Sequence, residues 1–130
     1  MNTKSKDVSI NFPEEGLVTS CEVEELGEGL YKLLDHPIMA GQAKYGDTIR
    51  AEIESPGQLK FLEVVEESDN KMFDFILSKE IIESEKFKAL KERLNRENIF
   101  WQQDFGGCFM CFIPKDCTLD IEAEIGKIVT

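Results

Sequence analysis

The chain has few of the residues that carry most enzyme chemistry, and few cations for its size. It contains one histidine, one tryptophan and four cysteines among 130 residues, with 15 basic against 26 acidic side chains. The net charge of −11 repels phosphate backbones and anionic headgroups, so nucleic acid and membrane surfaces are excluded as partners. The same charge favours a basic protein partner, although acidity also serves solubility alone.

Long apolar runs are absent as well. No segment approaches the roughly 20 apolar residues of a membrane span, and residues 1–11 lack the apolar core of a secretory signal. The cysteines lie in apolar or strand-like surroundings, which suits a reducing compartment. The sequence therefore predicts a cytoplasmic protein without a membrane segment, and its length suits one domain or two sub-domains that share a core.

The strand and turn patterns predict an α+β fold. Residues 1–12 are interpreted as a flexible tail, residues 13–69 as a small antiparallel β sub-domain, and residues 70–130 as an α+β sub-domain of one compact unit. Alternating apolar and polar residues predict four strands in the first part, which form a small sheet or barrel. The alternation slips at Leu62-Glu63, which indicates a β-bulge.

The second part has a β-α-β-β order, typical of a ferredoxin-like half. A buried strand is expected over residues 72–77, and Ser78 or Ser84 would cap the helix that follows. Asp104 to Gly107 suits a hairpin turn between two further strands. Residues 118–129 fit strand alternation and helical spacing alike, and we expect a helix there.

Candidate catalytic groups are few. His36 is the only histidine, so a catalytic triad would need it, with Asp35 beside it as the orienting group. Neighbouring side chains on a strand point to opposite faces, however. Cys108 and Cys111 match the Cys-x-x-Cys spacing, yet residues three apart on a strand also diverge. No catalytic residue, metal site or cofactor is therefore predicted.

Binding residues are expected in the irregular loop that starts at Asp35 and His36 and ends at Tyr45. Asp47 belongs to the turn that follows this loop. Trp101 is either an interface anchor or a core residue. The basic residues of the predicted helix are interpreted as a solvated face.

Several short motifs carry a family resemblance. The segments Gly29–Leu33, His36–Ile38, Tyr45–Glu52 and Leu59–Ser68 resemble the domain of unknown function 4265 family, which is bacterial and uncharacterised. Asp69 stands where that family often has glycine. The resemblance implies the segment order and a bacterial cytosolic setting, but no activity and no catalytic residue.

Three functions are compatible with these patterns. The first is a non-enzymatic protein-binding module, an inhibitor or immunity-type protein that binds a basic partner through its acidic surface. The second is a small-ligand-binding regulatory domain, with residues 35–46 lining a pocket between the halves. The third is a hydrolase or thiol enzyme that uses His36 or Cys108. The sequence favours binding over catalysis and predicts no oligomeric state.

Overall fold

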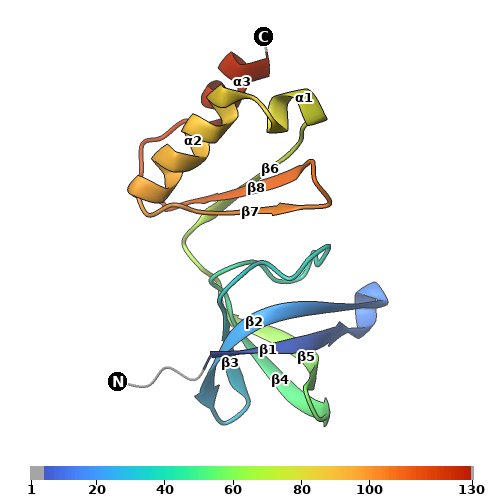
Figure 1. Ribbon diagram of the computed structural model, residues 1–130. Helices are drawn as coiled ribbons and strands as arrows, with labels where there is room; N and C mark the ends of the chain where they lie inside the picture. The colour runs from blue at the N-terminus through green and yellow to red at the C-terminus, as the bar shows by residue number, and fades with distance from the viewer. Residues whose placement is uncertain (1–4, 130) are drawn as a thin grey trace. The chain divides into compact units, whose positions relative to one another are not determined.

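The chain divides into two compact units in the computed structural model, which describes residues 5–129 (Figure 1). Unit 1 is Met1–Ser68 and unit 2 is Asp69–Thr130, so the boundary lies one residue before the predicted one. Each unit has its own cluster of buried apolar residues. No helix of the described residues is both long enough and apolar enough to cross a membrane.

Unit 1 is a closed five-stranded barrel in the order β1-β2-β3-β4-β5. Its elements are β1 (Ser5–Phe12), the short 3-10 helix η1 (Pro13–Glu15), β2 (Leu17–Gly27), β3 (Leu30–Leu33), β4 (Thr48–Ser55) and β5 (Gln58–Glu66). Strands adjacent in the sequence pair antiparallel, and β1 pairs parallel with β5 to close the barrel.

The predicted tail is wrong over Ser5–Phe12, which form β1; residues 1–4 of that tail lie outside the described residues. Val8, Ile10 and Phe12 alternate with polar residues and are buried in the barrel. Because successive side chains of a strand point to opposite faces, these three residues give β1 one apolar face that points into the barrel. The tail was predicted because the pattern lies next to a polar N-terminus.

The inner faces of the other strands largely follow the predicted alternation. Cys21, Val23, Ile49 and Ala51 are buried, as expected. The register of β4 and β5 shifts between Arg50 and Ala51, which leaves one extra residue in β5 and confirms the bulge at Leu62-Glu63. Ile53 was expected inside but is 70% exposed, and all the residues of β4 that follow Ala51 are exposed.

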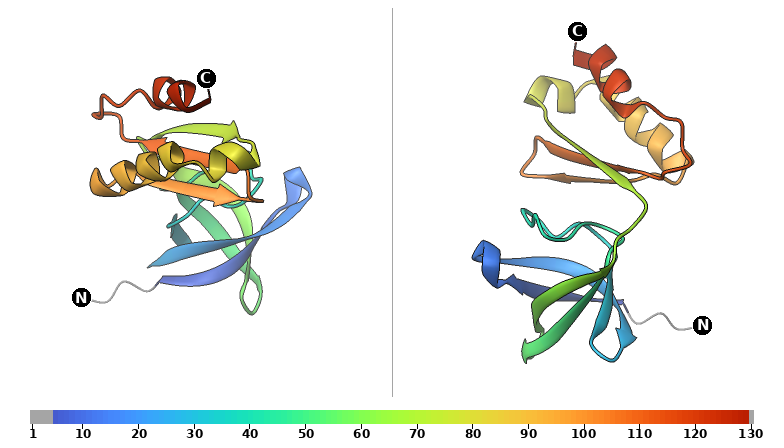
Figure 2. Two further views of the ribbon diagram at one scale, coloured as in Figure 1. Left: turned by 45° about the horizontal axis from the view of Figure 1, so that its top comes forward. Right: turned by 180° about the vertical axis from the view of Figure 1, so that it is seen from behind.

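Unit 2 places helices on one face of a three-stranded antiparallel sheet (Figure 2). The elements are β6 (Lys71–Ile76), α1 (Lys79–Ile82), α2 (Glu85–Arg96), β7 (Phe100–Asp104), β8 (Cys108–Ile113) and α3 (Ile121–Val129). The sheet order is β6-β8-β7. The chain order β-α-β-β is present, whereas the ferredoxin-like arrangement is not confirmed.

The core of unit 2 lies between the helices and the sheet. It combines apolar side chains of α2, β8 and α3, namely Phe87, Leu90, Leu94, Phe109, Cys111, Ile113, Ile121 and Ile125. Both candidate caps are used, since Ser78 accepts from the Ile81 amide and Ser84 from the Phe87 amide. The helix expected near the C-terminus is confirmed as α3. The strand expected over residues 72–77 is present as β6, but the prediction that it is buried is wrong. No residue of β6 is fully buried, and Ile76 is 84% exposed.

Candidate binding surfaces

The loop between β3 and β4, where most binding residues were predicted, is packed rather than open. Ala40 and Ala43 belong to the barrel core, and His36 is only 4% exposed. The Glu15 carboxylate accepts hydrogen bonds from the amides of Gly41 at 2.7 Å and Gln42 at 3.0 Å. Buried apolar residues and a carboxylate clamp indicate that this loop completes the barrel structurally.

Asp47 is a buried structural carboxylate at the end of that loop. It is 2% exposed, and its oxygens accept from the backbone amides of Lys44 at 3.0 Å and Ser68 at 2.8 Å. The Lys44 ammonium also lies 3.3 Å from it. A buried charge needs such partners, and these bonds join the loop to the residues just after β5. This predicted binding residue therefore faces inward.

The other predicted residues are divided between the two units. The Asp35 carboxylate accepts from the Glu22 amide at 3.0 Å, and Tyr45 is half-buried. Trp101 lies in unit 2, where its indole Nε1 donates to Asn95 at 2.9 Å and its ring lies 5.8 Å from that of Phe109. Trp101 thus packs against the core of unit 2. A role in binding stays a prediction for all five residues.

The cysteines are free thiols, and two are buried. Burial raises the pKa of the Cys111 thiol to about 12. Burial, followed by a hydrogen bond with Asp35, also raises the pKa of Cys21. Reactive thiols have lowered pKa values, so these two are poor nucleophiles. Within residues 5–129, no group of three histidine, cysteine or acidic side chains is placed to hold a metal ion.

The outer face of β1 and β2 carries three acids, Asp7, Glu22 and Glu24, which we call the β1–β2 acidic face. Asp7 lies directly opposite Glu22 in the antiparallel register. No ion pair of the described residues includes any of the three. Two acids on β4 and β5 differ, since Glu63 pairs with Arg50 at 3.3 Å and Glu54 accepts from Asn11 and Gln58.

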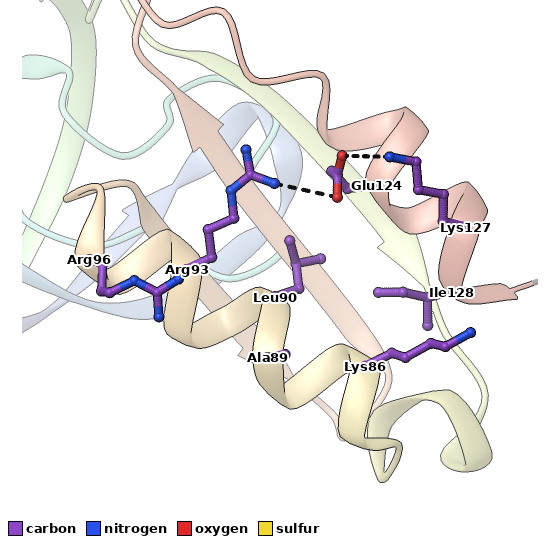
Figure 3. A pocket seen from close by; sticks show the side chains of 8 residues that line it. All are labelled: Lys86, Ala89, Leu90, Arg93, Arg96, Glu124, Lys127 and Ile128. Carbon is purple, nitrogen blue, oxygen red and sulfur yellow. Dashed lines mark hydrogen bonds and ion pairs between the residues drawn. The ribbon is translucent and has the colours of Figure 1, made fainter.

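A groove between α2 and α3 is lined mainly by positively charged side chains (Figure 3). It has a volume of about 390 Å³. Its residues are four cations, one acid and three apolar side chains, namely Lys86, Arg93, Arg96, Lys127, Glu124, Ala89, Leu90 and Ile128. We call this the α2–α3 groove.

The sequence did not reveal the α2–α3 groove. The cations of α2 follow helical spacing and resemble any solvated helix face. The missing information was the position of α3, which brings Lys127 and Glu124 alongside that face. Glu124 lies 3.4 Å from Arg93, a contact between residues 31 positions apart. No local pattern predicts such a contact.

Comparisons with known proteins give a likeness in fold. No protein-family model matches the chain, and no curated protein matches it. The chain is similar to the crystal structure of a hypothetical protein from Neisseria gonorrhoeae, with a TM-score of 0.60 and 12% sequence identity. The likeness covers 96% of this chain and 86% of that one. At this identity, the chain shares a fold with the Neisseria protein, and no activity is carried over.

Proposed function

We propose that this protein is a non-enzymatic binding module of the inhibitor or immunity type, and that the β1–β2 acidic face binds a basic protein. The observation that supports the proposal is the pairing of Asp7 opposite Glu22. Like charges directly opposite each other on a sheet destabilise it by a few tenths of a kcal/mol, up to about 1 kcal/mol. A basic partner would relieve this repulsion on binding.

The charge distribution of unit 1 supports the same partner. Residues 1–68 include 14 acidic and 6 basic side chains, a net charge of −8, out of −11 for the whole chain. Such a field speeds association with a cationic protein and repels anionic ones. Solubility alone requires acidic charge but does not require two acids in cross-strand register.

The test compares two variants with equal changes in charge. The first is Asp7→Asn/Glu22→Gln/Glu24→Gln, which neutralises the β1–β2 acidic face. The second is Glu80→Gln/Glu92→Gln/Asp116→Asn, which neutralises three exposed acids of unit 2. Each is immobilised beside the wild type in host lysate, and the captured proteins are identified by mass spectrometry at low and high salt.

The expected partner is a basic protein that the wild type and the second variant retain and the first variant loses. Its capture should also fall with salt, because counter-ions screen exposed charges. If both variants lose the partner equally, binding depends on the net charge of the chain and not on the β1–β2 acidic face, which would contradict the proposal. A partner that is acidic, or that the first variant still retains, would contradict the proposal.

A small-ligand-binding regulatory domain is the second candidate. The α2–α3 groove favours it, rather than residues 35–46, because that loop is packed into the barrel core while the groove is open. The resemblance to the domain of unknown function 4265 family, with its bacterial cytoplasmic setting, also remains a proposal. It is supported by the motifs in β3, β4 and β5, by the loop between β3 and β4, and by the segment from Leu90 to Trp101.

A further inference from the structure

We propose that the α2–α3 groove binds a small phosphate monoester, a doubly charged anionic group attached to an apolar portion. The proposal is independent of the β1–β2 acidic face, because it involves other residues and the opposite charge. The volume of about 390 Å³ falls within the range of small-molecule sites, about 300–1,000 Å³.

The charge of the groove departs from that of the chain. Its lining has four cations and one acid, a net charge of +3, on a chain with a net charge of −11. Lys86 and Arg96 form no ion pair within residues 5–129. They lie at opposite ends of the α2 segment that lines the groove, ten residues or about 15 Å apart along the helix (Figure 3). The groove therefore holds two positive charges, Lys86 and Arg96, that no ion pair of the described residues neutralises.

Arg93 lies between these ends and is held in place by two acids. Its Nε donates to Glu97 at 2.9 Å, while its Nη1 lies 3.4 Å from Glu124 across the groove. Glu124 also pairs with Lys127 at 3.2 Å (Figure 3). Guanidinium groups match the geometry of phosphate oxygens. We infer that Glu124 occupies the position of the ligand anion and that a phosphate group would replace it beside Arg93 and Lys127.

The apolar residues of the groove indicate what is attached to the phosphate group of the ligand. Ala89 and Leu90 on α2 and Ile128 on α3 provide a hydrophobic wall beside the cations. Apolar walls with a few charged groups are typical of small-molecule sites. A phosphate attached to a ring or a short alkyl group suits this combination better than a free phosphate ion does.

The test titrates the full-length protein with phenyl phosphate, inorganic phosphate and an oligoglutamate peptide, with calorimetry as the readout. Phenyl phosphate should bind most tightly. Arg93→Gln should weaken its binding at least tenfold. Glu124→Gln should strengthen it several-fold, since the variant removes the competing carboxylate. Lys88→Gln removes an equal charge from α2 outside the groove and should change binding less than twofold.

Each alternative result overturns the proposal. No binding of phenyl phosphate at millimolar concentration would do so, as would equal binding of inorganic phosphate, which would indicate general anion attraction. Tighter binding of the peptide would identify a protein-docking groove instead. Weaker binding by Glu124→Gln would show that Glu124 supports the site rather than competes in it. Circular dichroism of each variant separates loss of binding from loss of fold.

Discussion

There is no room for a side chain at Gly107, the residue just before β8. A Cβ placed there would lie 2.5 Å from the carbonyl oxygen of Leu77, a backbone atom that cannot move aside as a side chain can. The Gly107 carbonyl also accepts from the Leu77 amide at 2.8 Å, which holds the two segments together. Glycine is required here by close backbone approach.

Gly107→Ala should therefore lower the free energy of unfolding by about 1–3 kcal/mol, the range for overpacked sites. Urea unfolding followed by Trp101 fluorescence measures the change, since Trp101 lies in the same unit. Gly126→Ala is the matched control, because a Cβ at this position of α3 meets nothing within 4 Å. In a helix interior alanine should stabilise by about 0.5–1 kcal/mol. Equal effects of the two substitutions would contradict the steric explanation.

Single residues were predictable where their role is local. The bulge at Leu62 and the caps Ser78 and Ser84 follow from patterns a few residues long. Asp47 is the opposite case, because one of its partners, the Ser68 amide, is 21 residues away. The sequence shows an acid after a glycine turn, but not that its carboxylate points inward. The pattern therefore predicts a binding residue, and only the fold shows that its carboxylate is buried.

Among the elements, α2 depends on its cap more than α1 does. The Ser84 hydroxyl accepts from the Phe87 amide at 3.2 Å and donates to the Ile81 carbonyl at 2.7 Å, so it joins the two helices. Ser84→Ala should cost about 1 kcal/mol, a typical value for a lost N-cap. Ser78→Ala, at the exposed start of the four-residue α1, should cost less. Thermal unfolding of the two variants checks the order, and a larger loss for Ser78→Ala would contradict it.

For the cross-strand acids of β1 and β2, we predict that a substitution increases stability instead of lowering it. Asp7→Asn should stabilise the barrel by about 0.2–1 kcal/mol at low salt, because it removes repulsion with Glu22. The gain should shrink at about 1 M salt, where the screening length is about 3 Å. Glu52→Gln is the control: Glu52 lies opposite Lys60, so its neutralisation should not stabilise. Urea unfolding followed by circular dichroism measures both, and equal shifts would exclude a register-specific repulsion.

The strands of the barrel were easier to predict than the way in which it closes. β2 and the first half of β4 show clear alternation, β5 alternates up to its bulge, and each of these strands pairs with a neighbour in the sequence. β1 has only three inward apolar residues, and its closing contact joins Ser9 to Gln58, across 49 positions. Periodicity reports which side of a strand is buried, but not which distant strand it meets. The same limit applies to α3 and the α2–α3 groove.

For the molecule as a whole, the buried thiols make stability depend on alkaline pH. Burial raises the pKa of Cys111 from 9.0 to about 12, so the folded chain keeps a proton that the unfolded chain loses above about pH 9. Stability from this group is therefore fully present below pH 9 and is lost as pH rises from about 9 to 12. The raised pKa of Cys21 adds a loss of the same sign.

Urea unfolding at a series of pH values between 8 and about 11 should show this loss. Cys111→Ser should flatten the dependence, since a hydroxyl does not ionise in that range. Cys108→Ser, at a half-buried position of the same strand, serves as the control and should leave the slope closer to that of the wild type. An unchanged slope in Cys111→Ser would show that other groups cause the loss.

The parallel pairing of β1 with β5 also determines when the barrel can form during synthesis. Of the barrel strands β1 is made first, but its partner on one side begins only at Gln58, and the residues that pair with β1 extend to Lys60. Until then the strands made so far form an incomplete sheet whose two open edges are β1 and β4, and open edges are sites of aggregation. Contacts between distant residues also slow folding. We expect a ribosome-bound chain shorter than β5 to remain sensitive to protease, and resistance to appear only once β5 has left the exit tunnel.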